Sequence, residues 1–219
     1  MIRAAASTQP LDVFFNMKRF LPILVVMISG FFAPNVPARS AIRNIDFRNF
    51  TFPGIFEKRI TLRGGKSTVE TKNCETQYEL DDVIYRDLNR DGREDALVSI
   101  WDFTACGSSC VSYDFYIYTS KDDRPSLLWK FSSGCQGVGG LKDFRMSGRS
   151  LVFELFGKTW IAGAKIQSAG YNDGGECCPK FYSVVRVAWD GRRFRQVGMK
   201  FFPYNEPTAD DKYLRKHRH

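Results

Sequence analysis

The chain has 219 residues and a formal net charge of +8 at pH 7, and aromatic residues make up 15% of it. This length suffices for one domain with a sizeable core, and aromatic residues spread over short apolar segments favour sheets over a helix bundle. The two histidines, His217 and His219, stand at the extreme C-terminus. Their position excludes the usual Ser-His-Asp and Cys-His sites and most zinc hydrolase sites from the rest of the chain. Ser108 and Ser109 therefore have no base beside them.

The first 40 residues are predicted to be a secretory signal peptide. Lys18 and Arg19 precede the apolar run 20–33, and small residues then lead to Ala38 and Ser40, after one of which we expect cleavage. The run is shorter than the roughly 18–20 residues of a membrane-spanning helix, and an uncleaved N-terminal anchor is the alternative. Met17 is the alternative start, which would give a signal of ordinary length.

The signal carries +3 of the charge, so about +5 remains, and the basic residues of the last eight supply +4 of that. We expect residues 41–202 to form a single domain of nearly balanced charge and residues 203–219 to form a flexible basic tail. No basic stripe crosses this domain, so nucleic-acid binding is not expected. Nor is a transmembrane span expected after signal cleavage.

Short strands are predicted along the whole domain. Ile45, Phe47, Phe50 and Phe52 alternate with polar residues as strands do. Strands are also predicted at residues 78–88, 96–101, 113–118 and 127–131, with a turn at residues 122–125 and a Gly-rich connection at 132–140. Hairpins are expected within residues 144–160, and between 182–189 and 193–199, where Asp190-Gly191 forms the turn.

The acidic loop at residues 87–95 carries the most specific chemical pattern. Oxygen-bearing side chains occupy its first, third, fifth and ninth positions, and Gly92 stands sixth, where a sharp curl needs a positive φ. Ca²⁺ prefers six to eight oxygens at about 2.3–2.6 Å, and a tightly curled loop can aim alternate side chains inward. The predicted ligands are Asp87, Asn89, Asp91, Arg93 and Asp95. The alternative is an ordinary Asp-Gly hairpin turn with solvated carboxylates.

Six cysteines follow the signal, at positions 74, 106, 110, 135, 177 and 178. An even number in an exported chain predicts disulfides in an oxidising compartment, here the periplasm or the medium. The sequence leaves the pairing open. Cys106 and Cys110 could close a small loop, and Cys177 and Cys178 could reach separate partners such as Cys135 and Cys74. A thiolate metal site is disfavoured, because no CxxC pair or nearby histidine is present.

The order of these motifs resembles a group of small, uncharacterised secreted bacterial proteins. The shared features are a DFxNFTYP-like start at residues 45–53, the DVxYxDLxxDGxxEA pattern at 82–96, a Gly-rich segment, CCP at 177–179 and WDG at 189–191. The acidic loop itself resembles those of FG-GAP/VCBS-type repeats. The resemblance spans residues 44–198 and implies an all-β periplasmic or secreted domain, without implying an activity.

Together these patterns predict an all-β, disulfide-stabilised domain of antiparallel sheets, as a sandwich or a partial propeller. We expect a non-catalytic protein that binds an unknown protein or glycan partner at the cell envelope, with Ca²⁺ as a possible structural ion. The alternative is a carboxylate-dependent hydrolase of envelope glycans or peptides, for which Asp102, Asp114 and Glu154 are the candidate acids. Trp101, Tyr116 and Tyr118 are expected in the core, or else on a binding surface.

Overall fold

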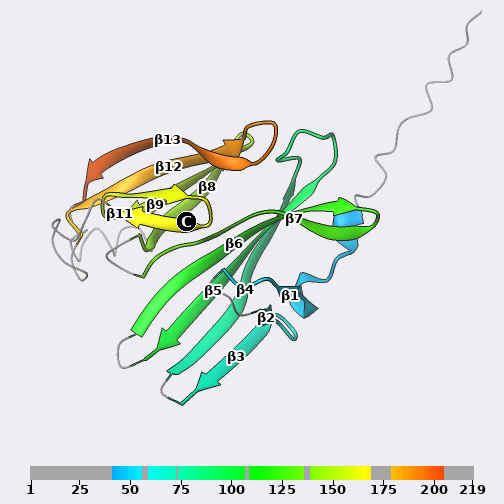
Figure 1. Ribbon diagram of the computed structural model, residues 1–219, viewed down its shortest axis with the longest axis horizontal. Coiled ribbons are helices and arrows are strands. Elements are labelled where there is room, and N and C mark those ends of the chain that lie inside the picture. Colours follow the sequence, from blue (N-terminus) through cyan, green and yellow to red (C-terminus); the bar gives the residue numbers. More distant parts are fainter. Residues whose placement is uncertain are drawn as a thin grey trace, which may run out of the picture. The chain divides into compact units, whose positions relative to one another are not determined.

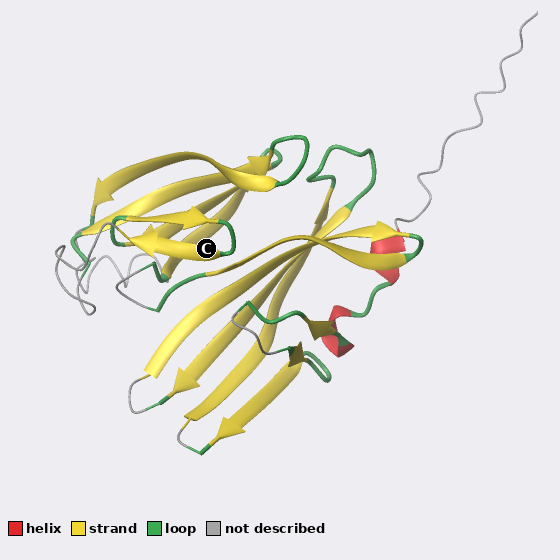
Figure 2. Ribbon diagram, in the orientation of Figure 1, coloured by secondary structure: helices red, strands yellow, loops and turns green. Residues whose placement is uncertain are grey.

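The computed structural model describes residues 41–55, 59–72, 74–106, 109–135, 139–168 and 179–204. The predicted signal peptide, Cys177, Cys178 and residues 205–219 of the predicted tail lie outside these residues, whereas Pro203, the first residue of that tail, belongs to the last strand. The described residues form antiparallel β-sheets without an α-helix (Figures 1 and 2). The expectation of an all-β domain is confirmed. None of the described helices is long and apolar enough to cross a membrane.

Two short 3₁₀ helices precede a series of strands, and many of the strands are joined by tight turns. In chain order the elements are η1 (Ala41–Asn44), η2 (Phe47–Asn49), β1 (Thr51–Phe52), β2 (Ile60–Thr61), β3 (Lys66–Thr71), β4 (Cys74–Arg86), β5 (Asp95–Ala105), β6 (Ser109–Lys121), β7 (Arg124–Ser132), β8 (Leu141–Ser147), β9 (Ser150–Phe156), β10 (Thr159–Ala162), β11 (Lys165–Ser168), β12 (Phe181–Trp189) and β13 (Phe194–Pro203).

The larger sheet has five antiparallel strands in the order β3-β4-β5-β6-β7, so each strand pairs with its neighbours in sequence. Its strands twist and curl across the sheet (Figure 1). The predicted turn between β6 and β7 is present, with φ of 51° at Asp122 and 58° at Asp123. Two successive positive φ angles are typical of a type I′ turn, which matches the twist of the flanking strands.

The smaller sheet has four strands in the order β13-β12-β9-β8, and β10 and β11 form a separate two-stranded ribbon. The β8–β9 and β12–β13 pairs confirm the two predicted hairpins. Gly148 and Gly191 have φ of 61° and 100° at their turns, where glycine carries no steric cost. In β12, Val185 and Val187 are buried on one face and Arg186 is exposed on the other, as alternation predicts.

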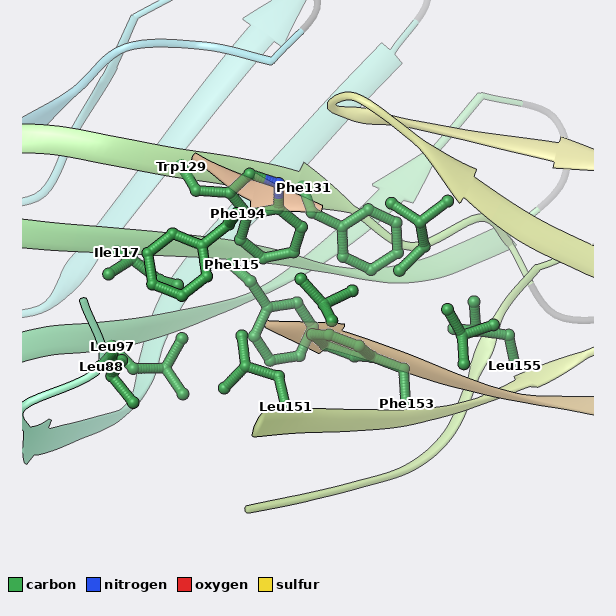
Figure 3. Close-up of a cluster of buried hydrophobic side chains, with 13 residues drawn as sticks. Leu88, Leu97, Phe115, Ile117, Trp129, Phe131, Leu151, Phe153, Leu155 and Phe194 are labelled. Atoms are coloured by element: carbon green, nitrogen blue, oxygen red, sulfur yellow. The ribbon is translucent and has the colours of Figure 1, made fainter. Parts of the chain in front are cut away.

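The inter-sheet core fills the space between the two sheets (Figure 3). Phe153 of β9 lies at its centre, with ring centroids 5.0 Å from Phe115, 5.1 Å from Phe131 and 5.1 Å from Phe144. The buried members of this core are Leu88, Leu97, Phe115, Ile117, Trp129, Phe131, Leu151, Phe153, Leu155, Ile161, Val185, Val187 and Phe194. Aromatic packing of this kind holds the sheets together through dispersion and burial.

The opposite face of the five-stranded sheet is covered by the N-terminal segment. Phe47 and Phe52 pack against Tyr116 and Tyr118 of β6 in a second cluster, the N-terminal core. Strand β6 therefore has buried side chains on both faces. This finding confirms the expectation that Tyr116 and Tyr118 belong to a core.

The strands predicted around Ile45 to Phe52 are largely wrong, because only Thr51–Phe52 is a strand. Asp46 caps the 3₁₀ turn η2 by accepting a hydrogen bond of 3.0 Å from the backbone N–H of Arg48. Asn49 accepts another, of 2.8 Å, from the N–H of Gly64. Side chains that satisfy nearby backbone groups in this way compete with sheet formation.

Two disulfides correct the suggested cysteine pairing. Cys74 is bonded to Cys106 and Cys110 to Cys135. Cys106 and Cys110 therefore do not close a loop with each other, and the suggestion that Cys135 and Cys74 pair with Cys177 and Cys178 is wrong. Antiparallel pairing is the physical reason, since it places the start of β4 beside the end of β5 and the start of β6 beside the end of β7. Both bonds are compatible with an extracellular or periplasmic protein.

Candidate functional site

The acidic loop between β4 and β5 is a tight turn whose side chains cap its own backbone. Asp87 accepts a hydrogen bond of 2.7 Å from the N–H of Arg90. Asn89 accepts one of 2.9 Å from the N–H of Asp91, and Asp91 accepts one of 2.9 Å from the N–H of Arg93. Such Asx turns let Asp and Asn residues fold a short segment without a regular ladder. A positive φ at Arg90 completes the curl.

The second oxygens of Asp87 and Asp91 face donors. Asp87 Oδ2 lies 3.5 Å from the Arg149 guanidinium, and Asp91 Oδ2 accepts bonds of 3.1 Å from Asn89 Nδ2 and 3.2 Å from Arg93. Partial burial raises the pKa of Asp91, but the Arg93 N–H and these side chains outweigh it, so the pKa lies below its ordinary value. Arg93 of the loop and Arg149 of the β8–β9 turn thus offset the charges of Asp91 and Asp87.

Asp95, the ninth position of the loop, is fully buried at 0% exposure. Its Oδ2 accepts hydrogen bonds from the N–H groups of Leu88 (2.9 Å) and Asn89 (3.0 Å), which ties the two ends of the loop together. Its Oδ1 has no hydrogen bond of ordinary geometry, and neither has the Thr119 hydroxyl. Burial raises the pKa of Asp95, although the two N–H groups and the nearby Thr119 counteract the rise.

These residues fit a self-capped turn more directly than a metal site. Among the described residues, no group of three or more His, Cys, Asp or Glu side chains is arranged to hold a metal ion. Ca²⁺ binding would require Asp91 to give up Arg93, and Asp87 to give up Arg149. The predicted ligands remain in one short loop, and the Ca²⁺ site remains a prediction.

Two of the three candidate catalytic acids come together. In the antiparallel pair of β5 and β6, Asp102 lies opposite Ser112, and Asp114, two residues further along β6, lies opposite Ile100. The two acids are therefore diagonal neighbours on one face of the sheet. Cα atoms in such positions are about 7–8 Å apart. Asp102 is 8% exposed and accepts a bond of 2.7 Å from Ser112 Oγ, while Asp114 is 5% exposed and accepts one of 3.2 Å from the Tyr116 hydroxyl.

Burial dominates the electrostatics of this acid pair. It raises the pKa of Asp102, and it raises the pKa of Asp114 to about 6, with the charge of Asp102 adding to the rise. Ser132, Tyr116 and Lys130 oppose it. A carboxyl group with a raised pKa can act as a general acid in catalysis. Here, however, each side chain is more than nine-tenths buried.

Glu154 lies in the other sheet, on β9, and does not join the pair. Its two oxygens accept bonds of 2.6 Å from Lys142 and 2.6 Å from Arg145. Partial burial raises the pKa of Glu154, but the two cations lower it by more, so the pKa lies below its ordinary value. Glu154 is therefore a partly buried, ion-paired carboxylate, and the three-acid arrangement does not form.

Trp101 is partly exposed on β5, beside Phe103, with ring centroids 6.1 Å apart and planes within 7° of parallel. It is the one aromatic residue of the three predicted for a binding surface that lies outside both cores. The side chains of Ser108 and Ser109, together with His217 and His219, lie outside the described residues.

Strand β13 exposes apolar side chains that the sequence did not single out. Val197 is 49% exposed, Met199 37%, Phe201 42% and Phe202 38%. β13 is an edge strand that pairs with β12 alone among the described strands. The adjacent Phe201 and Phe202 before Pro203 indicate that apolar side chains lie on both faces of this strand. The alternation of Val197, Met199 and Phe201, however, is also typical of an ordinary core strand.

An open cavity of about 260 Å³ lies at the start of β13. Trp129, Ile161 and Phe194 form its apolar walls, and Arg193 and Arg195 supply its charge. The β10–β11 ribbon borders β13 here, since the N–H of Ile161 donates a bond of 2.9 Å to Gln196 of β13. The exposed apolar stretch begins one residue later along the strand.

Comparison with known proteins does not place the chain in a class. No family model matches it, and no curated protein matches it closely enough to count as a relative. The function must therefore be argued from the surface and the acid groups described above.

Proposed function

We propose that this protein is an exported, non-catalytic β-domain that binds a polypeptide partner in extended conformation along β13. The single observation that carries the proposal is the exposed apolar edge, with four apolar side chains between positions 197 and 202 each more than a third exposed. Natural proteins usually protect such edges with charges, short strands or a covering segment. Large exposed apolar groups of this kind mark interaction sites.

The geometry of β13 suits the addition of a strand. β13 contains a β-bulge at Val197, because Gln196 pairs with Val187 of β12 and Gly198 pairs with Arg186, which leaves Val197 without a partner on β12. Residues 198–202 then pair regularly with β12. Alternate residues of an edge strand direct their N–H and C=O groups outward. A bound strand would pair with these groups, while Met199 and Phe201 contact its side chains on one face.

The alternative, a carboxylate-dependent hydrolase, is less favoured. Asp102 and Asp114 are neighbours on one face of the sheet and both have raised pKa values, as a general acid needs. Both are under one-tenth exposed. Neither lines the cavity of about 260 Å³ at the start of β13, nor a second cavity of about 200 Å³ that Asp81, Ser99 and Arg145 help to line. A glycan or peptide bond would not reach them without displacement of the surrounding structure.

Charge introduced at the edge is expected to abolish partner binding. In affinity capture from an envelope extract, wild-type protein should retain a partner at least about tenfold more strongly than the Met199→Lys/Phe201→Lys variant, because a desolvated apolar contact is replaced by two hydrated charges. Val111→Lys, which alters another exposed apolar side chain, should retain the partner as the wild type does. Equal retention by all three proteins, or by none, would contradict the proposal.

We propose further that the acidic loop can take up Ca²⁺ as a structural ion. The spacing of its oxygen ligands and its positive φ angles at Arg90 and Gly92 support this. Ligands that bind only the folded state raise the melting temperature, so Ca²⁺ should raise the midpoint of thermal unfolding relative to chelator. Asp91→Ala should remove this response. An identical melt with Ca²⁺ and with chelator would show that the loop is only a turn.

A further inference from the structure

The charge of the protein is divided unevenly between its two halves. In residues 139–168 and 179–204, which contain the four-stranded sheet and the β10–β11 ribbon, 11 basic residues face three acidic ones, a formal charge of +8. In the described residues from 41 to 135, 12 basic residues face 14 acidic ones, a charge of −2. The exposed edge strand therefore belongs to the strongly basic half.

Basic side chains also flank the edge itself. Arg186 and Lys200 are exposed on the outer face of the four-stranded sheet, and neither forms an ion pair with a described residue. Arg186 lies opposite Gly198, where a Cβ would come within 3.9 Å of the Arg186 Cβ. Because Gly198 has no side chain, Arg186 can extend past it toward a strand added to the edge. Arg193 adds a further cation at the adjacent cavity.

The two faces of β13 thus differ in chemistry. Met199 and Phe201 lie on the face of Val185, toward the inter-sheet core, whereas Lys200 lies on the outer face with Arg186. Phe202 shares that outer face, but its ring stacks on Tyr182 of β12, with ring centroids 5.4 Å apart. An added strand shows its alternate side chains to the same two faces. A segment in which apolar and acidic residues alternate would satisfy both faces in one register.

We propose that the partner strand bound along β13 is acidic, with Asp or Glu residues alternating with apolar ones. This inference rests on the proposed function and specifies its ligand. A second copy of the chain is disfavoured as occupant, because pairing β13 with itself would bring two halves of charge +8 together. Anionic polymers and membranes would neutralise the positive charge around β13, but they would leave the outward N–H and C=O groups of this edge strand without hydrogen-bond partners.

Synthetic peptides can test this proposal directly. The probes are a nine-residue peptide of alternating Val and Glu, matched peptides with Thr or Lys in place of Glu, and a Val-Glu peptide N-methylated at alternate residues. Binding is measured by fluorescence anisotropy at low and high salt. The Val-Glu peptide should bind at least about tenfold more tightly than the Thr peptide, since charge complementarity adds to strand pairing. Binding should weaken with salt.

Variants separate the charge effect from the strand-pairing effect. Arg186→Glu/Lys200→Glu should weaken Val-Glu binding at least about tenfold and leave the Thr peptide unaffected, whereas Met199→Lys/Phe201→Lys should weaken both. Equal affinity for the Glu, Thr and Lys peptides would leave the proposed function standing and overturn the acidic ligand. Equal binding of the N-methylated peptide, of vesicles with about 30% anionic lipid or of an oligonucleotide would also overturn it, in favour of a general polyanion surface.

Discussion

Asp114→Asn is expected to make the protein more stable than the wild type above pH 6, and to give no such advantage at pH 4. Asp114 has its pKa raised from 3.8 to about 6, first by burial and further by Asp102. The folded protein therefore binds more protons than the unfolded chain between these values. The free energy of unfolding of the wild type therefore falls as the pH rises from about 4 to 6, and the full decrease is reached above pH 6. The shift corresponds to roughly 3 kcal/mol.

The measurement is the free energy of unfolding in urea at pH 4 and at pH 8 for both proteins. The amide of the variant cannot ionise, so the difference between variant and wild type should change by up to about 3 kcal/mol between the two pH values. Any constant effect of the amide cancels in this comparison. Asp122→Asn, at an exposed turn, controls for the loss of one carboxylate. A difference that does not vary with pH would show that Asp114 is not kept protonated by its surroundings.

Phe153→Ala is expected to cost about 3–5 kcal/mol of unfolding free energy. Its ring is fully buried and contacts aromatic rings from both sheets, with Phe115 and Phe131 on one side and Phe144 on the other. Alanine would leave a cavity at the place where the sheets meet (Figure 3). Neighbouring rings attached to paired strands can collapse only partly into that space.

Phe202→Ala provides the matched comparison for the same experiment. Phe202 is 38% exposed on the edge strand, so its removal should cost below about 1 kcal/mol. If the two alanine variants proved equally stable, the inter-sheet core would not be what joins the sheets. The same pair of variants separates binding from stability, because only Phe202 lies on the proposed interface.

The sequence predicted the strands well where alternation and turn chemistry agreed. The hairpin expected at Asp190-Gly191 and the one expected within residues 144–160 are both present. The prediction failed where side chains hydrogen-bond locally, as at Asp46, or where strands are short, as in the β10–β11 ribbon. A local pattern of apolar residues does not reveal where a side chain such as that of Asp46 will hydrogen-bond the backbone N–H groups in place of a neighbouring strand.

The candidate sites were less predictable, for a different physical reason. Asp102 and Asp114 were named as acids, but only strand register shows that they are neighbours and Glu154 is not. The exposed edge was missed, because Met199 and Phe201 alternate as core residues do. Exposure at an edge depends on which elements cover it, and a sequence pattern contains no such information. Cysteine pairing was undetermined for the same reason.

The two disulfides have a consequence for a chain that meets proteases. Each closes a hairpin at the end opposite its turn, so residues 74–106 and 110–135 are covalent rings. A single cut in the acidic loop, or at the turn of Asp122 and Asp123, opens a ring without releasing a fragment. The nicked protein would stay one molecule on a non-reducing gel and divide only after reduction.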